Sequence, residues 1–194
     1  ENDDYSGPVM IKSNLNYAGV PEALRLNRYH AGSASAGFSF IKSIRTLLKA
    51  AQYRFLTQHS AYLILDNLSK VPREWFARLD IVVQRFCPEY ENGLYHVRYY
   101  LFMGDRCTCE RVSSRQPIVK DATSVSREPV DVHPEIEKMR NALHFDYGKF
   151  DYVIYEGKPV LLDINKTVGA AKKVTPEIEA MRKHRAEGIY SYFR

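Results

Sequence analysis

The sequence predicts an α+β protein in which most strands pair in antiparallel sheets. Two observations indicate this fold class. Short β-branched or aromatic runs follow one another with Gly-containing turns between them, as at residues 94–103 and 150–165. Helical periodicity is confined to separate segments, at residues 38–59, 134–145 and 176–190. Hairpins therefore outnumber strand–helix–strand units, which argues against a doubly wound parallel sheet.

Bulk composition limits the classes of function. The 194 residues are 45% hydrophobic, with 28 basic and 23 acidic residues and a net charge of +5. This balance suits polyanionic ligands, nucleotides included. No apolar run approaches the roughly 20 residues that span a bilayer, so we expect no membrane insertion. Three cysteines without zinc-type spacing suggest reduced thiols and a cytoplasmic protein.

The first half of the chain alternates short strands with helical segments. Residues 8–12 form an apolar run that ends in Lys12, which predicts a strand leading into a turn-rich loop. Residues 38–59 repeat apolar side chains at helical spacing and predict a packed helix. A buried strand is expected at residues 61–65, a helical turn at 72–78 and a β-branched strand at 79–86.

The second half is richer in strands. Residues 87–93 are expected to connect the strand before them to an aromatic strand at 94–103, which places His96, Arg98 and Tyr100 on one side. Residues 106–113 follow after a turn. The basic stretch 111–132 has little periodicity and predicts a mobile loop. A helix at 134–145, strands at 150–155 and 159–165, and a helix at 176–190 complete the chain.

The last two strands carry the residues that point to chemistry. If residues 156–158 form a three-residue turn, Asp151 lies opposite Asp163, and Asn165 shares the face of Asp163. Two facing carboxylates repel one another, and a divalent cation resolves the repulsion. Magnesium prefers such oxygen ligands and completes its shell with water and phosphate oxygens. A register shifted by one residue would separate the acids and leave an ordinary exposed polar face.

This hairpin resembles the end of the ATP-grasp domain, whose family members join a carboxylate to an amine at the expense of ATP. The resembling segments are residues 150–151, 161–165 and Gly169. The resemblance implies that Asp151, Asp163 and Asn165 bind Mg²⁺ against the phosphates of ATP. It also implies two lobes that clasp the nucleotide, a smaller one at residues 1–78 and a larger one at residues 79–194.

Two further segments are similar to nucleotide-binding parts of the same family. The strand at residues 82–87 resembles the hinge that meets adenine, which implies a binding role for four consecutive residues, Gln84, Arg85, Phe86 and Cys87. Glu91 stands at the spacing of the acid that binds the ribose hydroxyls, although a solvated acid explains it equally well.

Two basic residues complete the resemblance. Lys12 matches the strand lysine that binds ATP phosphates. Arg98 matches a catalytic basic residue near the transferred phosphoryl group, with a sheet-surface arginine as the alternative.

The chain also departs from the family pattern. Asp163 stands where the family often has Glu, and the phosphate lid at residues 14–19 has only Gly19. The family's N-terminal lobe has no counterpart before Pro8, so we expect the C-terminal ATP-binding portion of a ligase.

The expected function is thus an ATP-dependent carboxylate–amine ligase domain that forms an acyl phosphate. Its substrates would be small-molecule or peptide carboxylates and amines, and a homo-oligomer is left open. Alternatives are an ATP-binding module without ligase activity and, ranked lower, a nucleic-acid-binding domain suggested by the basic loop and 14 tyrosines.

Overall fold

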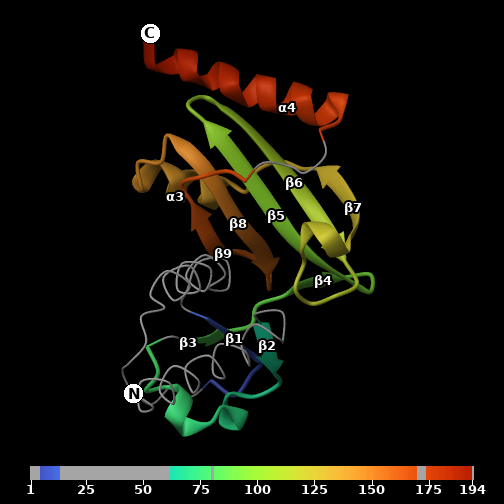
Figure 1. Cartoon of the computed structure of the whole chain (residues 1–194), viewed down its shortest axis with the longest axis vertical. Coiled ribbons are helices and arrows are strands. Elements are labelled where there is room, and N and C mark those ends of the chain that lie inside the picture. Colours follow the sequence, from blue (N-terminus) through green and yellow to red (C-terminus); the bar gives the residue numbers. More distant parts are fainter. Residues whose placement is uncertain (1–4, 14–61, 80, 170–173, 194) are drawn as a thin grey trace, which may run out of the picture. The chain divides into compact units, whose positions relative to one another are not determined.

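The computed structural model describes residues 5–13, 62–79, 81–169 and 174–193 (Figure 1). The chain divides into two compact units between Phe86 and Cys87. The predicted helix at residues 38–59 and the predicted lid at residues 14–19 lie outside the described residues. Within the described ranges, no helix has the length and apolar character needed to cross a membrane.

The first unit contains a three-stranded antiparallel sheet in the order β2-β1-β3. Its strands are β1 (Val9–Ser13), β2 (Tyr62–Leu65) and β3 (Ile81–Arg85), and two 3₁₀ turns, Leu68–Lys70 and Arg73–Trp75, lie between β2 and β3. Alternate residues of β1 are buried with Val71 and Ile81 in a small core. The strand β3, which the domain prediction assigned to the larger lobe, pairs with β1 in this unit.

The second unit is built on a six-stranded antiparallel sheet. The main path runs β7-β6-β5-β8-β9, and the short β4 pairs with β5. The strands are β4 (Glu89–Glu91), β5 (Leu94–Met103), β6 (Arg106–Ser114), β7 (Ser124–Pro129), β8 (Tyr147–Tyr155) and β9 (Lys158–Asn165). Because every described pairing in both sheets is antiparallel, the predicted α+β class with mostly antiparallel sheets is confirmed.

The helices of the second unit begin where the sequence predicts. The helix α3 (Pro134–Ala142) starts after His133, whose side chain accepts a hydrogen bond from the Glu135 amide. The helix α4 (Pro176–Ala186) starts after Thr175 and continues into a 3₁₀ segment, Glu187–Phe193. Each has proline at its first position, where the missing amide hydrogen costs nothing.

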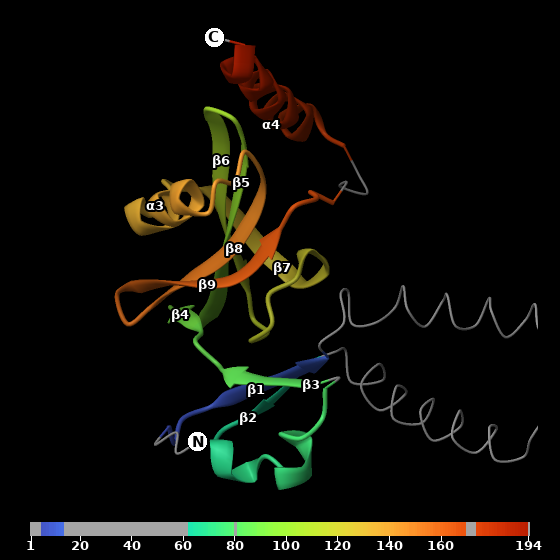
Figure 2. The same ribbon diagram turned by 90° about the vertical axis from the view of Figure 1, so that its left-hand side faces the viewer.

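The two faces of the larger sheet differ in what covers them. One face packs its aromatic side chains against Ile136 of α3, and both views show α3 beside this sheet (Figure 2). The buried residues of this core are Tyr100, Phe102, Cys109, Ile136, Phe150 and Tyr152. The other face buries a smaller cluster of Val97, Val112 and Val153. Near the β5–β6 turn, α4 lies across the sheet and Arg185 bonds to Thr108.

Two predicted connections in this unit are strands. The segment 87–93 contains β4, which pairs with β5 through a tight turn at Asn92 and Gly93, both with positive φ. The predicted mobile loop at 111–132 is wrong at residues 111–114 and 124–129, because β6 extends to Ser114 and β7 pairs with it, while residues 115–123 between these strands contain bends and a short 3₁₀ segment. Most of β7 is exposed on both faces. Its sequence therefore needs no alternation of apolar and polar residues, which is the pattern that would have predicted a strand.

Candidate functional site

The turn between β8 and β9 is tighter than predicted. It contains two residues, Glu156 and Gly157, with φ values of 51° and 76°. Positive φ at both central residues is the conformation of a type I′ two-residue hairpin turn. Tyr155 therefore pairs with Lys158, whereas the predicted three-residue turn would have paired it with Pro159. The predicted turn is wrong by one residue.

A β-bulge in β9 compensates for this difference. Tyr152 pairs with Leu161, while the preceding residue, Asp151, pairs with Asp163. The extra residue, Leu162, shifts the register by one and brings Asp163 to the face on which Asp151 lies. The predicted pairing of the two acids is therefore confirmed, by a different route from the one expected.

Asp163 is also hydrogen-bonded to the side chain of Asn165. The Asn165 Nδ2 donates to Asp163 Oδ2 at 2.9 Å, and the backbone amide of Ile164 donates to Asp163 Oδ1 at 3.0 Å. Asn165 donates through nitrogen, so its amide oxygen is not used in this bond. Among the described residues, no three His, Cys, Asp or Glu side chains group as a metal site. The patch offers two carboxylates and one amide.

Asp151 is the least satisfied carboxylate of the patch. The Lys149 Nζ donates to Asp151 Oδ2 at 3.0 Å and lies 2.9 Å from Oδ1. Oδ1 is buried, and among the described residues Lys149 is its one cationic neighbour. Burial raises the pKa of Asp151; Lys149 opposes this rise, and the charge of Asp163 adds to it. Lys149 compensates one of the two facing carboxylates, so a further cation would favour the pair.

Lys149 is a neighbour that the sequence analysis missed. Its ammonium lies 3.7 Å from the centroid of the Tyr99 ring and contacts Asp151 at the same time. Tyr99 and Asp151 are cross-strand partners, so all three side chains share one face of the sheet. The spacing Lys-x-Asp could have indicated this contact, since side chains two residues apart on a strand point to the same face.

Arg98 lies on the opposite face. It pairs across the strands with Tyr152, one residue beyond the pairing of Tyr99 with Asp151. Its Nε and Nη2 donate to Glu89 at 3.2 and 2.9 Å. The structure therefore does not bring Arg98 together with the carboxylate patch, and it gives the guanidinium a partner in Glu89.

Glu89 is the second residue that the sequence analysis missed, and it is almost fully satisfied. Its side chain is 8% exposed and lies 3.1 Å from the Nε of Arg111. It also accepts the backbone amide of Ile154 at 2.7 Å, which links β4 to β8. Glu89 thus binds two arginines and one amide.

The predicted ribose ligand Glu91 also meets Arg111. The two side chains form an ion pair, and this hydrogen bond lowers the pKa of Glu91. Arg111 contacts Glu128 as well, at 3.5 Å. Two basic residues of the predicted loop are therefore neutralised locally, since Arg127 pairs in turn with Glu110 and Asp121.

The remaining predicted residues belong to strands of the first unit or follow them. Lys12 is the fourth residue of β1 and pairs with Tyr62 and Val82. Gln84 and Arg85 end β3, where Arg85 lies 4.5 Å from the centroid of the Tyr5 ring.

The other two hinge residues follow this strand. The Phe86 amide donates to the Pro8 carbonyl at 2.9 Å, and the Cys87 side chain is half-buried. Lys12 is thus on a strand, as predicted, and the hinge residues continue its neighbouring strand.

Comparison with known proteins adds no relative. No protein-family model, no curated protein and no solved structure matches the chain. The functional argument therefore depends on the residues of the hairpin and their surroundings.

Proposed function

We propose that this chain is the MgATP-binding part of an ATP-grasp-type ligase that joins a carboxylate to an amine. The observation that carries the proposal is the patch on one face of the β8–β9 hairpin. There, Asp151 stands opposite Asp163, and the side chain of Asn165 bonds to Asp163. Such opposed carboxylates are unfavourable unless a positive charge separates them.

The residues of the patch fit a divalent cation. Their ligand atoms are the carboxylate and amide oxygens that magnesium prefers. Within the described part of the chain, the buried Oδ1 of Asp151 has one cationic neighbour, Lys149 Nζ at 2.9 Å, and Asp163 has none, so a bound cation would balance the second acid. The ligands of Mg²⁺ would be Asp151, Asp163 and Asn165. When bound, Mg²⁺ would neutralise part of the phosphate charge.

Lys149 gives the patch a positive charge. Phosphoryl transfer depends mainly on positioning and on stabilising charge at the transferred group. Lys149 is ion-paired with Asp151 and stands on the same face, whereas Arg98 is held by Glu89 on the other face. In the proposal, Lys149 therefore takes the role beside the phosphoryl group that the sequence analysis gave to Arg98.

The nucleotide contacts in the proposal are those that the resemblance implies. Lys12 would bind phosphate oxygens as a point charge, and residues 84–87 would meet adenine. The proposed reaction transfers the γ-phosphoryl group to a substrate carboxylate, giving ADP and an acyl phosphate. An amine then attacks the acyl carbon and releases phosphate. The cytoplasm is the proposed location, because it supplies MgATP and keeps thiols reduced.

Calorimetric titration with ATP, with and without Mg²⁺, tests the binding proposal. Binding should require Mg²⁺ and should weaken at least tenfold in Asp163→Ala, because a charged contact contributes about 1.5–3 kcal/mol. Asp105→Ala is the matched control, since Asp105 is an exposed acid in the β5–β6 turn. Equal ATP affinity in all three proteins, or affinity independent of Mg²⁺, would reject the site.

Turnover is a separate measurement. ADP release should rise when pooled carboxylates and amino acids are added to the intact chain, and it should stay at background in Asp163→Ala. Mg²⁺-dependent ATP binding without any stimulated ADP release would instead identify a nucleotide-binding module that lacks ligase activity.

A further inference from the structure

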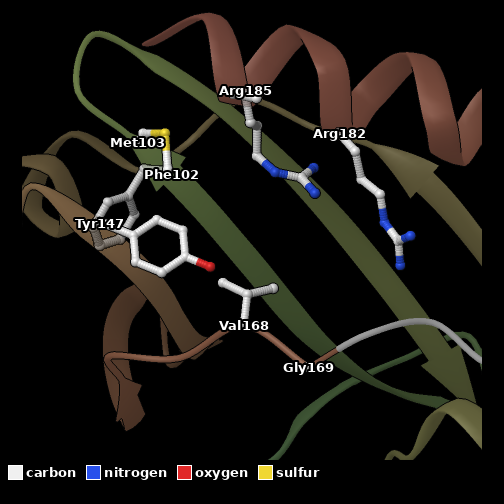
Figure 3. A pocket seen from close by; sticks show the side chains of 8 residues that line it. Phe102, Met103, Tyr147, Val168, Gly169, Arg182 and Arg185 are labelled. Carbon is white, nitrogen blue, oxygen red and sulfur yellow. The ribbon is translucent and has the colours of Figure 1, made fainter. Parts of the chain in front are cut away.

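A pocket lies between α4 and the larger sheet. A pocket of about 300 Å³ is formed there by strand ends, the segment after β9 and one face of α4. Figure 3 shows the guanidinium groups of Arg182 and Arg185 extending from α4 toward this space. The lining residues are Phe102, Met103, Tyr147, Val168, Gly169, Arg182, Arg185 and Ala186. The pocket belongs entirely to the second unit.

The two arginines that line the pocket are partly buried. Arg185 Nη1 donates to Thr108 Oγ1 at 2.8 Å, which is a neutral acceptor. Burial lowers the pKa of Arg185; Glu110 opposes this effect, and the nearby charge of Arg182 adds to it. Across residues 81–169 and 174–193, neither arginine forms an ion pair with a carboxylate within 4.0 Å. Partly buried positive charge of this kind favours an anion.

Other arginines of the same unit show that this arrangement is unusual for the molecule. Arg98, Arg111 and Arg127 each contact at least one carboxylate. Arg140 donates to the backbone oxygens of Phe145 and Gly104 and to the Tyr100 hydroxyl. The guanidinium groups of the pocket therefore stand apart as cations with donors to spare.

The rest of the lining defines what else a ligand must contain. Met103 and Val168 contribute aliphatic surface, and Tyr147 contributes a ring with a hydroxyl group directed toward Val168 in Figure 3. A pocket of this volume is at the small end of ligand sites. The combination of two guanidinium groups and an apolar wall suits a small molecule with one oxyanion and a short apolar body.

We propose that this pocket binds a small organic oxyanion, a carboxylate or a phosphate ester, whose charged group pairs with Arg182 and Arg185. Its apolar part lies against Met103 and Val168. This inference goes beyond MgATP binding and does not depend on it, because the pocket shares none of the predicted metal or nucleotide residues.

Titration with simple probes tests the site on the full chain. Benzoate, phenyl phosphate and inorganic phosphate are added separately, and binding is followed by calorimetry and by NMR shifts of backbone amides. We expect shifts at Tyr147, Val168 and Arg182. Phenyl phosphate should bind more tightly than inorganic phosphate, because only phenyl phosphate contacts the apolar wall. The stronger of benzoate and phenyl phosphate identifies the carboxylate or phosphate class.

Matched variants separate this site from general attraction to a basic protein. Arg182→Gln and Arg185→Gln should each weaken binding at least about tenfold, the effect of losing a charged hydrogen bond. Lys183→Gln removes the same charge from an exposed position on α4 and should retain the affinity. Asp163→Ala should also retain it, which distinguishes this pocket from the proposed ATP site.

Three outcomes would overturn the inference. The first is that none of the probes binds. The second is that Lys183→Gln weakens probe binding as much as the arginine variants do. The third is that MgATP displaces the probes and Asp163→Ala weakens their binding. Unchanged NMR spectra away from α4 would show that the arginine variants fold. Tyr147→Phe removes only a hydroxyl group from the pocket wall and leaves the charge unchanged. It should weaken probe binding less than either arginine variant does.

Discussion

Glu89 and Asp151 are both poorly exposed carboxylates of the same sheet, but their surroundings differ. Glu89 contacts Arg98 and Arg111 and accepts the amide of Ile154. Among the described residues, Asp151 contacts one cation, Lys149, whose Nζ lies 2.9 Å from the buried Oδ1, and it faces a second acid, Asp163. A carboxylate with two arginines and an amide holds strands together, whereas one that shares a single cation with a facing acid has capacity for a further positive charge. The comparison therefore separates a structural acid from a candidate functional acid on physical grounds.

The two carboxylates also act on opposite faces of the sheet. Arg98, the partner of Glu89, is on the face of the aromatic core beneath α3, where Tyr100 and Tyr152 are fully buried. Asp151 is on the other face with Tyr99 and Lys149. We expect substitutions in the first network to change stability, and substitutions in the second to change ligand binding.

The largest expected effect is the loss of stability in Glu89→Gln. The substitution keeps the shape of the side chain but leaves Arg98 and Arg111 without their buried partner. Breaking a buried ion pair costs about 3–5 kcal/mol, and urea unfolding at neutral pH measures it. Glu128→Gln is the control, because Glu128 contacts Arg111 with a side chain that is 57% exposed. A loss equal to that of the control would end the distinction between the two carboxylates.

The second prediction concerns Asp163→Asn. Without divalent cations, the variant should be as stable as the parent or slightly more stable, because it removes a like-charge pair. With MgATP at 100 times its dissociation constant, the parent should gain about 2.7 kcal/mol. The variant should lose most of this gain, measured by thermal unfolding. If MgATP stabilises both proteins equally, the patch is not a ligand site and Asp151 is structural like Glu89.

The third prediction tests whether Lys149 substitutes for a bound cation. Lys149→Met should cost about 1–2 kcal/mol in metal-free buffer, between the values of exposed and buried ion pairs. Magnesium should then stabilise the variant more than the parent, because Asp151 has lost its only ion-pair partner within the described residues. Lys158→Met, an exposed lysine of the same hairpin, is the control. Equal magnesium effects in all three proteins would contradict this role.

The hairpin shows how far sequence reasoning reaches. The opposition of Asp151 and Asp163 could be predicted, although the turn was one residue too long and the bulge was missed. These two offsets cancel. The bulge was invisible because residues 160–162 are all apolar, so neither face of β9 is marked by alternation. The prediction that Asp151 and Asp163 share a face was therefore correct, although the predicted pairing of the residues next to the turn was not.

The remaining differences come from interactions between distant segments. β7 is an exposed edge strand held by backbone pairing to β6, so its side chains carry little strand signal. The contact of Glu89 with Arg98 depends on β4 turning back along β5. The placement of Arg185 against Thr108 depends on how α4 crosses the sheet. Local periodicity contains none of these distances.

The smallest expected effect is a pH dependence that belongs to Asp151 alone. Burial and the charge of Asp163 raise its pKa, and Lys149 opposes the shift. Between the ordinary and the raised pKa, the folded protein therefore holds a proton that the unfolded chain has released. Its contribution to stability falls as pH rises through that window, by at most about 1.4 kcal/mol per pH unit. Below the window, both states are protonated and the contribution is constant.

Asp151→Asn should abolish this slope, because asparagine does not titrate. Urea unfolding of the parent and the variant from pH 3 to 7, without divalent cations, gives the difference in free energy of unfolding at each pH. That difference should grow in favour of the variant with rising pH and then level off. Asp105→Asn, at an exposed turn, should show no such growth. A difference that is constant with pH would mean that Asp151 is as well compensated as Glu89, and the case for a ligand at the patch would lose its main support.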